Sequence, residues 1–128
     1  MDRMQKGLEV IEAMLPPEIA AGLRAGTKST AFGAARAEMT LDFVYGELWS
    51  RPGLDRRGRS LVTLGILIAL GNPEELRLHV FAALRNGCTI QEIEEALHHS
   101  AAYAGFPAAR VATEAARDVL KKNGLIDD

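Results

Sequence analysis

Apolar residues recur along most of the chain at the spacing of an α-helix, and helix-breaking residues separate one run from the next. In the N-terminal part, Leu8, Ile11 and Leu15 follow one helical face, and a Pro-Pro pair ends the run. A shorter helical turn is predicted over residues 19–23. The stretch over residues 26–33, rich in Gly, Ser and Thr, predicts a loop.

Two further helical patterns occupy the middle of the chain. Residues 34–49 are predicted to form a helix in which Met39, Phe43 and Gly46 share one stripe. Residues 56–70 follow Asp55, a residue type that favours a helix N-terminus. The second half of this segment is apolar all round, which predicts a helix that is central or buried by another subunit. Its β-branched residues are also compatible with a β-strand, but the length of the segment and its capping residues favour a helix.

The C-terminal half carries the clearest helix boundaries. Asn72-Pro73 is typical of a helix start, and Asn86-Gly87 of its end. A capping-box pattern over residues 89–92 begins the next helix. Residues 105–107 (GFP) separate it from a last helix that reaches about residue 122. Strand and hairpin signals are missing from the sequence, so we predict an all-α protein of six or seven helices in one domain, residues 1–128.

Composition and charge exclude several functional classes. The 128 residues are 48% hydrophobic and 25% charged, which is a globular balance. Fifteen Lys and Arg against 17 Asp and Glu give a net charge of -2, so we expect no nucleic-acid partner. A helix-turn-helix that ends with residues 108–122 is disfavoured, because Glu114 and Asp118 balance the cations there. A single cysteine, Cys88, excludes an internal disulfide or a CxxC motif.

The sequence also predicts where the protein works. The longest apolar run, residues 61–70, is far shorter than the roughly 20 residues that span a bilayer. The first residues are charged and show no signal-peptide pattern. We therefore expect no membrane partner and a cytoplasmic location.

Four arginines within nine residues form the most unusual local pattern. They are Arg51, Arg56, Arg57 and Arg59. Three of them lie in the first turn of a predicted helix, where cations are unfavourable unless an anion is present. Free backbone N–H groups and guanidinium groups together make a carboxylate or phosphate site. A solvated face, with Asp55 and Glu47 offsetting the charge, explains the pattern equally well.

Three histidines are candidates for chemistry. His79 lies toward the apolar side of its helix, and Glu75 lies one turn earlier, where it could hydrogen-bond the imidazole and favour its protonated form. That pair fits an acid–base catalyst or a core histidine. His98 and His99 project about 100° apart on a helix and are expected at the surface. No metal site is predicted.

Four sequence runs, in order and at matching spacing, resemble those of 4-carboxymuconolactone decarboxylases. The runs are YGELWSRPGL over residues 45–54, RSLVTL over 59–64, EELRLH over 74–79 and YAGFPAA over 103–109. The resemblance covers residues 32–120, which makes residues 1–31 an N-terminal extension. Two positions depart from the family pattern: Ala104 stands where Cys is frequent, and Gly58 where a longer residue is usual.

The resemblance implies the helical fold shared with alkylhydroperoxidase-D-like proteins and oligomers, commonly trimers of dimers. The peroxidase branch of that fold uses two cysteines and a glutamate ahead of its histidine. Aligned on His79, those positions hold Asn72, Glu75 and Ser60 here. Thiol peroxidase chemistry is therefore not expected at this site.

The resemblance implies a function: a cofactor-independent carboxy-lyase that converts 4-carboxymuconolactone, a small dianionic lactone, to 3-oxoadipate enol-lactone and CO2 in protocatechuate degradation.

The resemblance and this reaction together give each candidate residue a role. His79 would be the general acid, and Glu75 would orient it and raise its pKa. Arg51 and Arg59 would bind carboxylates and Ser60 would donate a hydrogen bond. Trp49 and Tyr103 would line the pocket, or equally be core or interface packing. Arg77 would be structural, paired with a nearby carboxylate. Alternatives are a paralogous decarboxylase or isomerase of another small carboxylated lactone, and a non-catalytic oligomeric binding protein.

Overall fold

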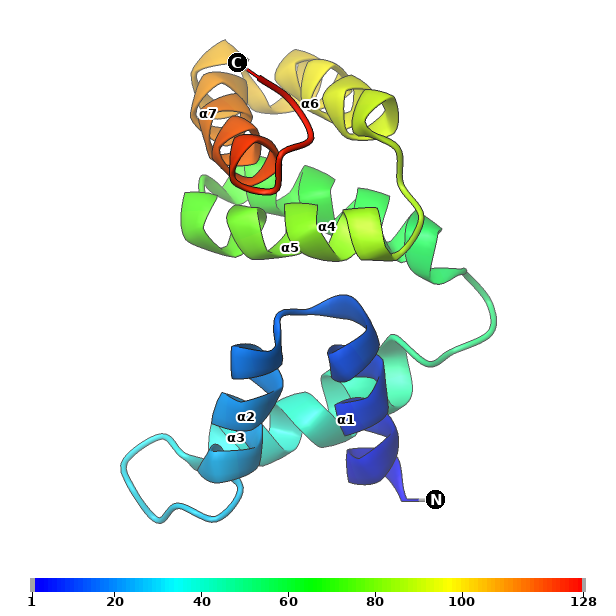
Figure 1. The fold of residues 1–128 in the computed structure, drawn as a ribbon, viewed down its shortest axis with the longest axis vertical. Helices are drawn as coiled ribbons and strands as arrows, with labels where there is room; N and C mark the ends of the chain where they lie inside the picture. Colours follow the sequence, from blue (N-terminus) through cyan, green and yellow to red (C-terminus); the bar gives the residue numbers. More distant parts are fainter. Residues whose placement is uncertain (1, 128) are drawn as a thin grey trace. The chain divides into compact units, whose positions relative to one another are not determined.

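The computed structural model describes residues 2–127, which form helices joined by turns and short loops, with no strand among them (Figure 1). The elements are α1 (Arg3–Met14), α2 (Pro17–Gly26), α3 (Ala35–Met39), the π-helix η1 (Thr40–Leu48), α4 (Arg56–Leu70), α5 (Pro73–Arg85), α6 (Ile90–Ala104) and α7 (Phe106–Lys122). The expected all-α class and helix order are confirmed. The chain divides into two compact units, one ending at Asp55 and the other beginning at Arg56.

The first unit is built around the contact between α1 and η1. Asp2 caps α1, because its carboxylate accepts a hydrogen bond of 2.8 Å from the backbone N–H of Gln5. Pro17 then begins α2 as a first-turn proline. The buried apolar side chains of this unit include Val10, Ile11, Met14 and Leu41.

The helix predicted over residues 34–49 begins as α3 and continues as a π-helix. The backbone N–H of Trp49 bonds to the carbonyl of Val44, five residues earlier, at 2.9 Å. The wider winding places Leu41, Tyr45 and Gly46 on the buried side. The residues of the predicted stripe therefore differ in burial: Gly46 is buried, whereas Met39 is 61% exposed and Phe43 is 54% exposed.

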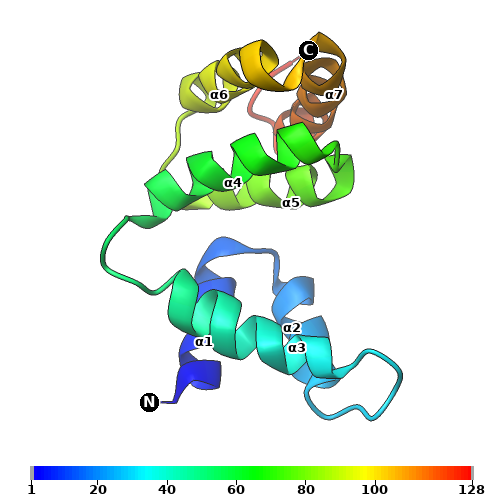
Figure 2. The same ribbon diagram turned by 180° about the vertical axis from the view of Figure 1, so that it is seen from behind.

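The second unit is a layer of two helices covered by two more. Helices α4 and α5 lie side by side, and α6 and α7 form the layer packed on them (Figures 1 and 2). Gly71, at φ +67°, reverses the chain between α4 and α5, and the side chain of Asn72 accepts a hydrogen bond of 3.2 Å from the backbone N–H of Glu75. The predicted capping box of α6 is present, with Thr89 and Glu92 each bonding the other's backbone.

An apolar core fills the space between these four helices. It consists of residues from every helix of the unit and from the turn after α5: Leu64, Ile68, Leu76, Val80, Ala83, Cys88, Ile93, Leu97, Ala112, Ala115, Ala116, Val119 and Leu120. Helix α7 contributes small alanines, which allow it to lie close to α5 and α6. Cys88 is a buried member of this core.

Helix α4 is not covered on all sides by its own chain. Ser60, Leu64 and Ile68 point into the core, whereas Val62, Ile66 and Leu70 are 55%, 54% and 72% exposed. The alternative of a fully central helix is therefore wrong, and the apolar outer stripe of α4 remains exposed. None of the helices between residues 2 and 127 combines the length and apolar character needed to cross a membrane.

Candidate active site

His79 occupies the buried side of α5, two turns after the helix begins. Only 8% of the residue is exposed, and it is one of two polar residues counted as buried among those described, the other being Ser60. Burial disfavours the charged imidazolium and lowers the pKa of His79 below its ordinary value of 6.5. The expectation of a raised pKa is wrong, because burial of the imidazole lowers the pKa and the Glu75 carboxylate is exposed.

Glu75 lies on the same helix as His79 but its side chain is exposed. Its backbone N–H is the group that Asn72 caps. The sequence placed the two residues one helical turn apart correctly, but this spacing did not reveal that one side chain is buried and the other faces solvent. The orienting role of Glu75 stays a prediction.

Arg59 and Ser60 stand at adjacent positions on α4, the helix that lies beside α5. Arg59 is half-buried, and Ser60 has no exposed surface. The Nδ2 group of Asn86 donates a hydrogen bond of 3.0 Å to Ser60 Oγ. Asn86 is a residue that sequence reasoning used only as a helix end. Its side-chain partner, 26 positions earlier, leaves no local signal.

The arginine cluster separates into residues with different partners. Arg57 forms an ion pair with Glu92 of α6, and Arg51 forms one of 3.2 Å with Glu47. The Arg51–Glu47 pair is the one that the solvated-face alternative expects, and carboxylate binding by Arg51 stays a prediction. Arg77 pairs with Asp118 of α7 at 3.1 Å, which confirms its expected structural pairing with a carboxylate.

The two aromatic candidates differ sharply in exposure. Trp49 is buried in the first unit, where its ring stacks on Tyr45 with centroids 6.1 Å apart. Tyr103 is 84% exposed and its ring lies 5.4 Å from that of His99. Trp49 and Arg51 belong to the first unit, and the other candidates belong to the second.

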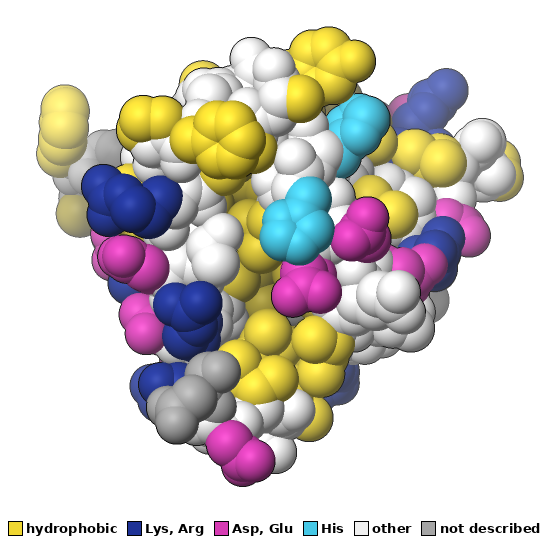
Figure 3. Space-filling view, turned by 90° about the horizontal axis from the view of Figure 1, so that it is seen from above, with side chains coloured by type: hydrophobic (Ala, Val, Ile, Leu, Met, Phe, Trp, Pro, Cys, Tyr) yellow, Lys and Arg dark blue, Asp and Glu magenta, His cyan; other side chains and the backbone are white. Residues whose placement is uncertain are grey.

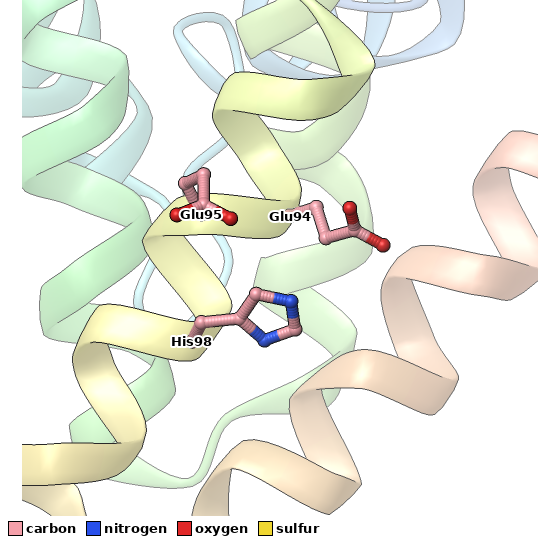
Figure 4. A group of neighbouring side chains, drawn as sticks. All are labelled: Glu94, Glu95 and His98. Atoms are coloured by element: carbon pink, nitrogen blue, oxygen red, sulfur yellow. The ribbon is translucent and has the colours of Figure 1, made fainter.

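A separate group of metal-binding residue types lies on the outside of α6. Glu94, Glu95 and His98 bring their possible ligand atoms within 4.8 Å of one another, and all three are exposed (Figure 4). They come from one helix, and exposed acidic groups are common without a metal. The exposure of His98 agrees with its expected place at the surface.

His98 also borders an open groove of about 860 Å³ between α6 and α7. Figure 3 shows apolar side chains in a hollow of this face, with histidine and acidic side chains beside it. The groove is lined by Leu97, His98, Ala101, Phe106, Pro107, Ala109, Arg110, Thr113, Glu114 and Arg117. None of the predicted catalytic residues lies in this groove, so it is not part of the candidate site.

The class defined by this arrangement is a small helical protein with a buried histidine on α5 and, on the packed helix α4, a buried serine next to a half-buried arginine in sequence. Residues 34–118 match the sequence model of the Carboxymuconolactone decarboxylase family, and the chain belongs to that family. All seven candidate site residues fall within the matched range.

Two curated relatives carry the names of decarboxylases. A 4-carboxymuconolactone decarboxylase of Acinetobacter baylyi is 48% identical over 83 residues, which cover 65% of this chain and 62% of the relative. A nitrosuccinic acid decarboxylase, npaB, of Metarhizium robertsii is 44% identical over 79 residues, or 62% of this chain and 55% of the relative. The chain thus matches somewhat more than half the length of these relatives.

Proposed function

We propose that the protein is a carboxy-lyase that converts 4-carboxymuconolactone to 3-oxoadipate enol-lactone and CO2. The observation that carries this proposal is the 48% identity to a relative named for that activity, over a region that surrounds the buried His79. The reaction would serve the breakdown of protocatechuate in the cytoplasm.

The substrate contains its own acceptor for the electrons that decarboxylation releases. The bond between the ring carbon and its carboxylate breaks, CO2 leaves, and the electron pair moves through the ring double bond onto the lactone carbonyl oxygen. A proton then adds to the ring carbon next to that carbonyl, and the double bond moves to give the enol-lactone. This route needs no cofactor, because the lactone carbonyl accepts the negative charge.

The protein must then hold two carboxylates and deliver one proton. We assign carboxylate binding to the guanidinium group of Arg59, because a planar guanidinium can bind a carboxylate through two hydrogen bonds. Ser60 would donate a further hydrogen bond to a carboxylate. Tyr103 would line the bound substrate, and the roles expected for Arg51 and Trp49, which belong to the first unit, stay predictions.

His79 would donate the proton as an imidazolium. Burial keeps the pKa of His79 low in the free protein, so near neutral pH the imidazole is mostly uncharged. A dianionic substrate bound beside it favours the charged form and draws a proton onto the ring. Substrate binding and proton uptake by His79 would therefore be linked, and Glu75 would help to orient the protonated ring.

Incubation of the purified protein with 4-carboxymuconolactone tests the substrate and the reaction together. Formation of enol-lactone and CO2 in equal amounts is the expected result. Binding without conversion would favour the non-catalytic alternative, in which the fold binds a small anion. If the protein neither binds nor converts the lactone, both the proposed decarboxylase and the non-catalytic binding protein are ruled out.

A second candidate function is decarboxylation of another small dicarboxylic acid. The relative named as a nitrosuccinic acid decarboxylase supports it, because a nitro group is also an electron acceptor. The two candidates share a substrate class: a small dicarboxylate with an acceptor conjugated to the carbanion. Comparing turnover of nitrosuccinate and of 4-carboxymuconolactone separates them.

Self-association through the outer stripe of α4 is part of the proposal. Val62, Ile66 and Leu70 repeat every four residues on the exposed side of the helix, and a second copy would cover them. A trimer of dimers is the expected assembly. Sedimentation of wild-type protein and of Ile66→Asp tests it, and a wild-type monomer would contradict it.

A further inference from the structure

Ser60 and Asn86 form a buried hydrogen bond in which the donor and acceptor are clear. Ser60 is 0% exposed, and its Oγ receives a hydrogen bond of 3.0 Å from Asn86 Nδ2. An amide nitrogen can only donate, so Ser60 Oγ is the acceptor. A serine hydroxyl that accepts here still has its own O–H proton to donate elsewhere.

Other helical hydroxyl groups in this protein use their protons differently. Thr40, Thr63 and Thr113 each donate to the carbonyl four residues earlier, at 2.8, 2.8 and 2.7 Å. Ser60 is also inside a helix, but its Oγ bonds instead to Asn86, at the end of the neighbouring helix. Among residues 2–127, this is the hydrogen bond that the structure gives to the Ser60 side chain, and it does not use the O–H proton of this fully buried residue.

The Asn86 side chain is not required to end α5. The backbone N–H of Asn86 bonds to the carbonyl of Ala82 at 2.8 Å, and Gly87 makes the turn with φ +96°. Asn123 ends α7 in the same way and is also followed by a glycine with positive φ, Gly124. The amide of Asn123, however, bonds to Val119 of its own helix at 2.8 Å. Only Asn86, of the two, directs its amide to another helix.

The position of Asn86 connects it to the candidate site. His79, Ala83 and Asn86 are spaced by four and three residues and so share one face of α5, and the axial distance from His79 to Asn86 is about 10 Å. Arg59 directly precedes Ser60 on α4. The Ser60–Asn86 bond therefore links the α4 segment that carries Arg59 to the helix face that carries His79.

We infer that Asn86 is a positioning residue for substrate binding: its amide holds Ser60 Oγ as an acceptor and so directs the Ser60 O–H proton toward a substrate carboxylate. This inference rests on the proposed decarboxylase function. Asn86 touches no reacting atom in this scheme, and it acts through Ser60.

Steady-state kinetics of four variants with 4-carboxymuconolactone tests this role. Ser60→Ala removes a hydrogen bond to a charged group and should raise KM about tenfold with kcat little changed. Asn86→Ala leaves the Ser60 hydroxyl without its partner and should raise KM about threefold to tenfold. The double variant should be no worse than Ser60→Ala, because Asn86 acts only through Ser60. Asn123→Ala is the matched control and should keep the wild-type KM.

Asn86→Asp adds a directional test that a purely structural role would not predict. A carboxylate at position 86 can only accept, so the Ser60 proton would turn toward it and away from the substrate. The expected KM is higher than that of Asn86→Ala. A KM equal to the wild type in both Asn86 variants would overturn the inference, and so would effects of Asn86→Ala and Ser60→Ala that add in the double variant.

Binding measurements separate this inference from the proposed function. If the wild-type protein does not convert the lactone, the proposed function fails, and calorimetry with the non-reacting dicarboxylate glutarate then tests Asn86. Weaker glutarate binding in both Ser60→Ala and Asn86→Ala, with Asn123→Ala unchanged, would support the inference. Equal binding by all variants, or no binding by the wild type, would overturn it.

Discussion

Gly7 of α1 and Gly46 of η1 lie where the two helices approach too closely for a side chain. A Cβ atom at Gly7 would overlap the carbonyl oxygen of Leu41, and one at Gly46 would overlap the carbonyl oxygen of Arg3. Both obstacles are backbone atoms, so neither can move aside without shifting a helix. The pair therefore fixes how the first unit is packed.

Substitution of Gly7 by Ala should destabilise the protein by about 1–3 kcal/mol, because the added methyl group pushes α1 away from η1. Gly22→Ala is the control: Gly22 lies inside α2, and a Cβ atom added there would meet no heavy atom within 4 Å. It should be neutral or stabilising by up to about 1 kcal/mol, since Ala is the better helix former. Urea unfolding measures both. Equal effects would show that α1 and η1 can separate without cost.

The His79→Ala variant should lose about 10²–10⁴-fold in kcat with 4-carboxymuconolactone, the usual contribution of a positioned general acid. His98→Ala removes an exposed imidazole and should keep wild-type kcat. Thermal melting of both variants accompanies the kinetics. A lower melting temperature with unchanged kcat per folded molecule would instead make His79 a core histidine.

Lowering the pH should reduce the free energy of unfolding, because the buried His79 resists protonation in the folded protein. Its pKa is lowered by burial in the folded protein and is near 6.5 when unfolded, so the unfolded chain binds more protons between these two values. The stability from the neutral, buried imidazole is present above pH 6.5 and is lost as the pH falls toward the lowered pKa. Urea unfolding of wild type and His79→Gln at pH 5 to 8 tests this. A wild type that loses no more stability than His79→Gln on acidification would contradict it.

Arg59→Lys should raise KM for the lactone about tenfold although the charge is kept, because an ammonium group cannot form the paired hydrogen bonds of a guanidinium. Arg110→Lys is the control: Arg110 forms an exposed pair with Glu114 on the same helix at 3.5 Å. It should leave KM unchanged. Wild-type kinetics in Arg59→Lys, with Arg59→Ala affecting only assembly, would make Arg59 structural.

Dialysis against a metal chelator should leave turnover intact, because the substrate's carbonyl accepts the electron pair. Glu94, Glu95 and His98 are the exposed group whose possible ligand atoms could hold a metal ion that the chelator removes. A loss of activity that is restored only by added metal, and that Glu95→Gln reproduces, would assign the triad a role in the reaction.

Most helix ends could be predicted because their causes are local. Asn72 and Thr89 cap helices with their own side chains, and Gly71 and Gly105 take the positive φ that ends a helix. The π-helix could not be predicted in this way. It places Gly46 against α1, and that contact joins residues about forty positions apart.

The helical positions of the candidate site residues could be predicted from the sequence, but the burial and hydrogen-bond partners of their side chains could not. The spacing of Glu75 and His79 gave their shared helix correctly, whereas the burial that lowers the pKa of His79 depends on tertiary packing. The bond between Asn86 and Ser60 also joins two helices, and a helix-ending Asn-Gly gives no sign of it. The exposure of Tyr103 was not predictable from its position in a family motif.

The winding of η1 has a consequence for how this chain aligns with others. Its hydrogen bonds enclose one residue more than those of an α-helix, so a single deletion within residues 40–48 lets the segment wind as an ordinary helix without breaking it. An alignment gap inside a helix usually signals an error. Here a one-residue gap in this segment is structurally sensible, because it removes the extra residue that a π-helical turn contains.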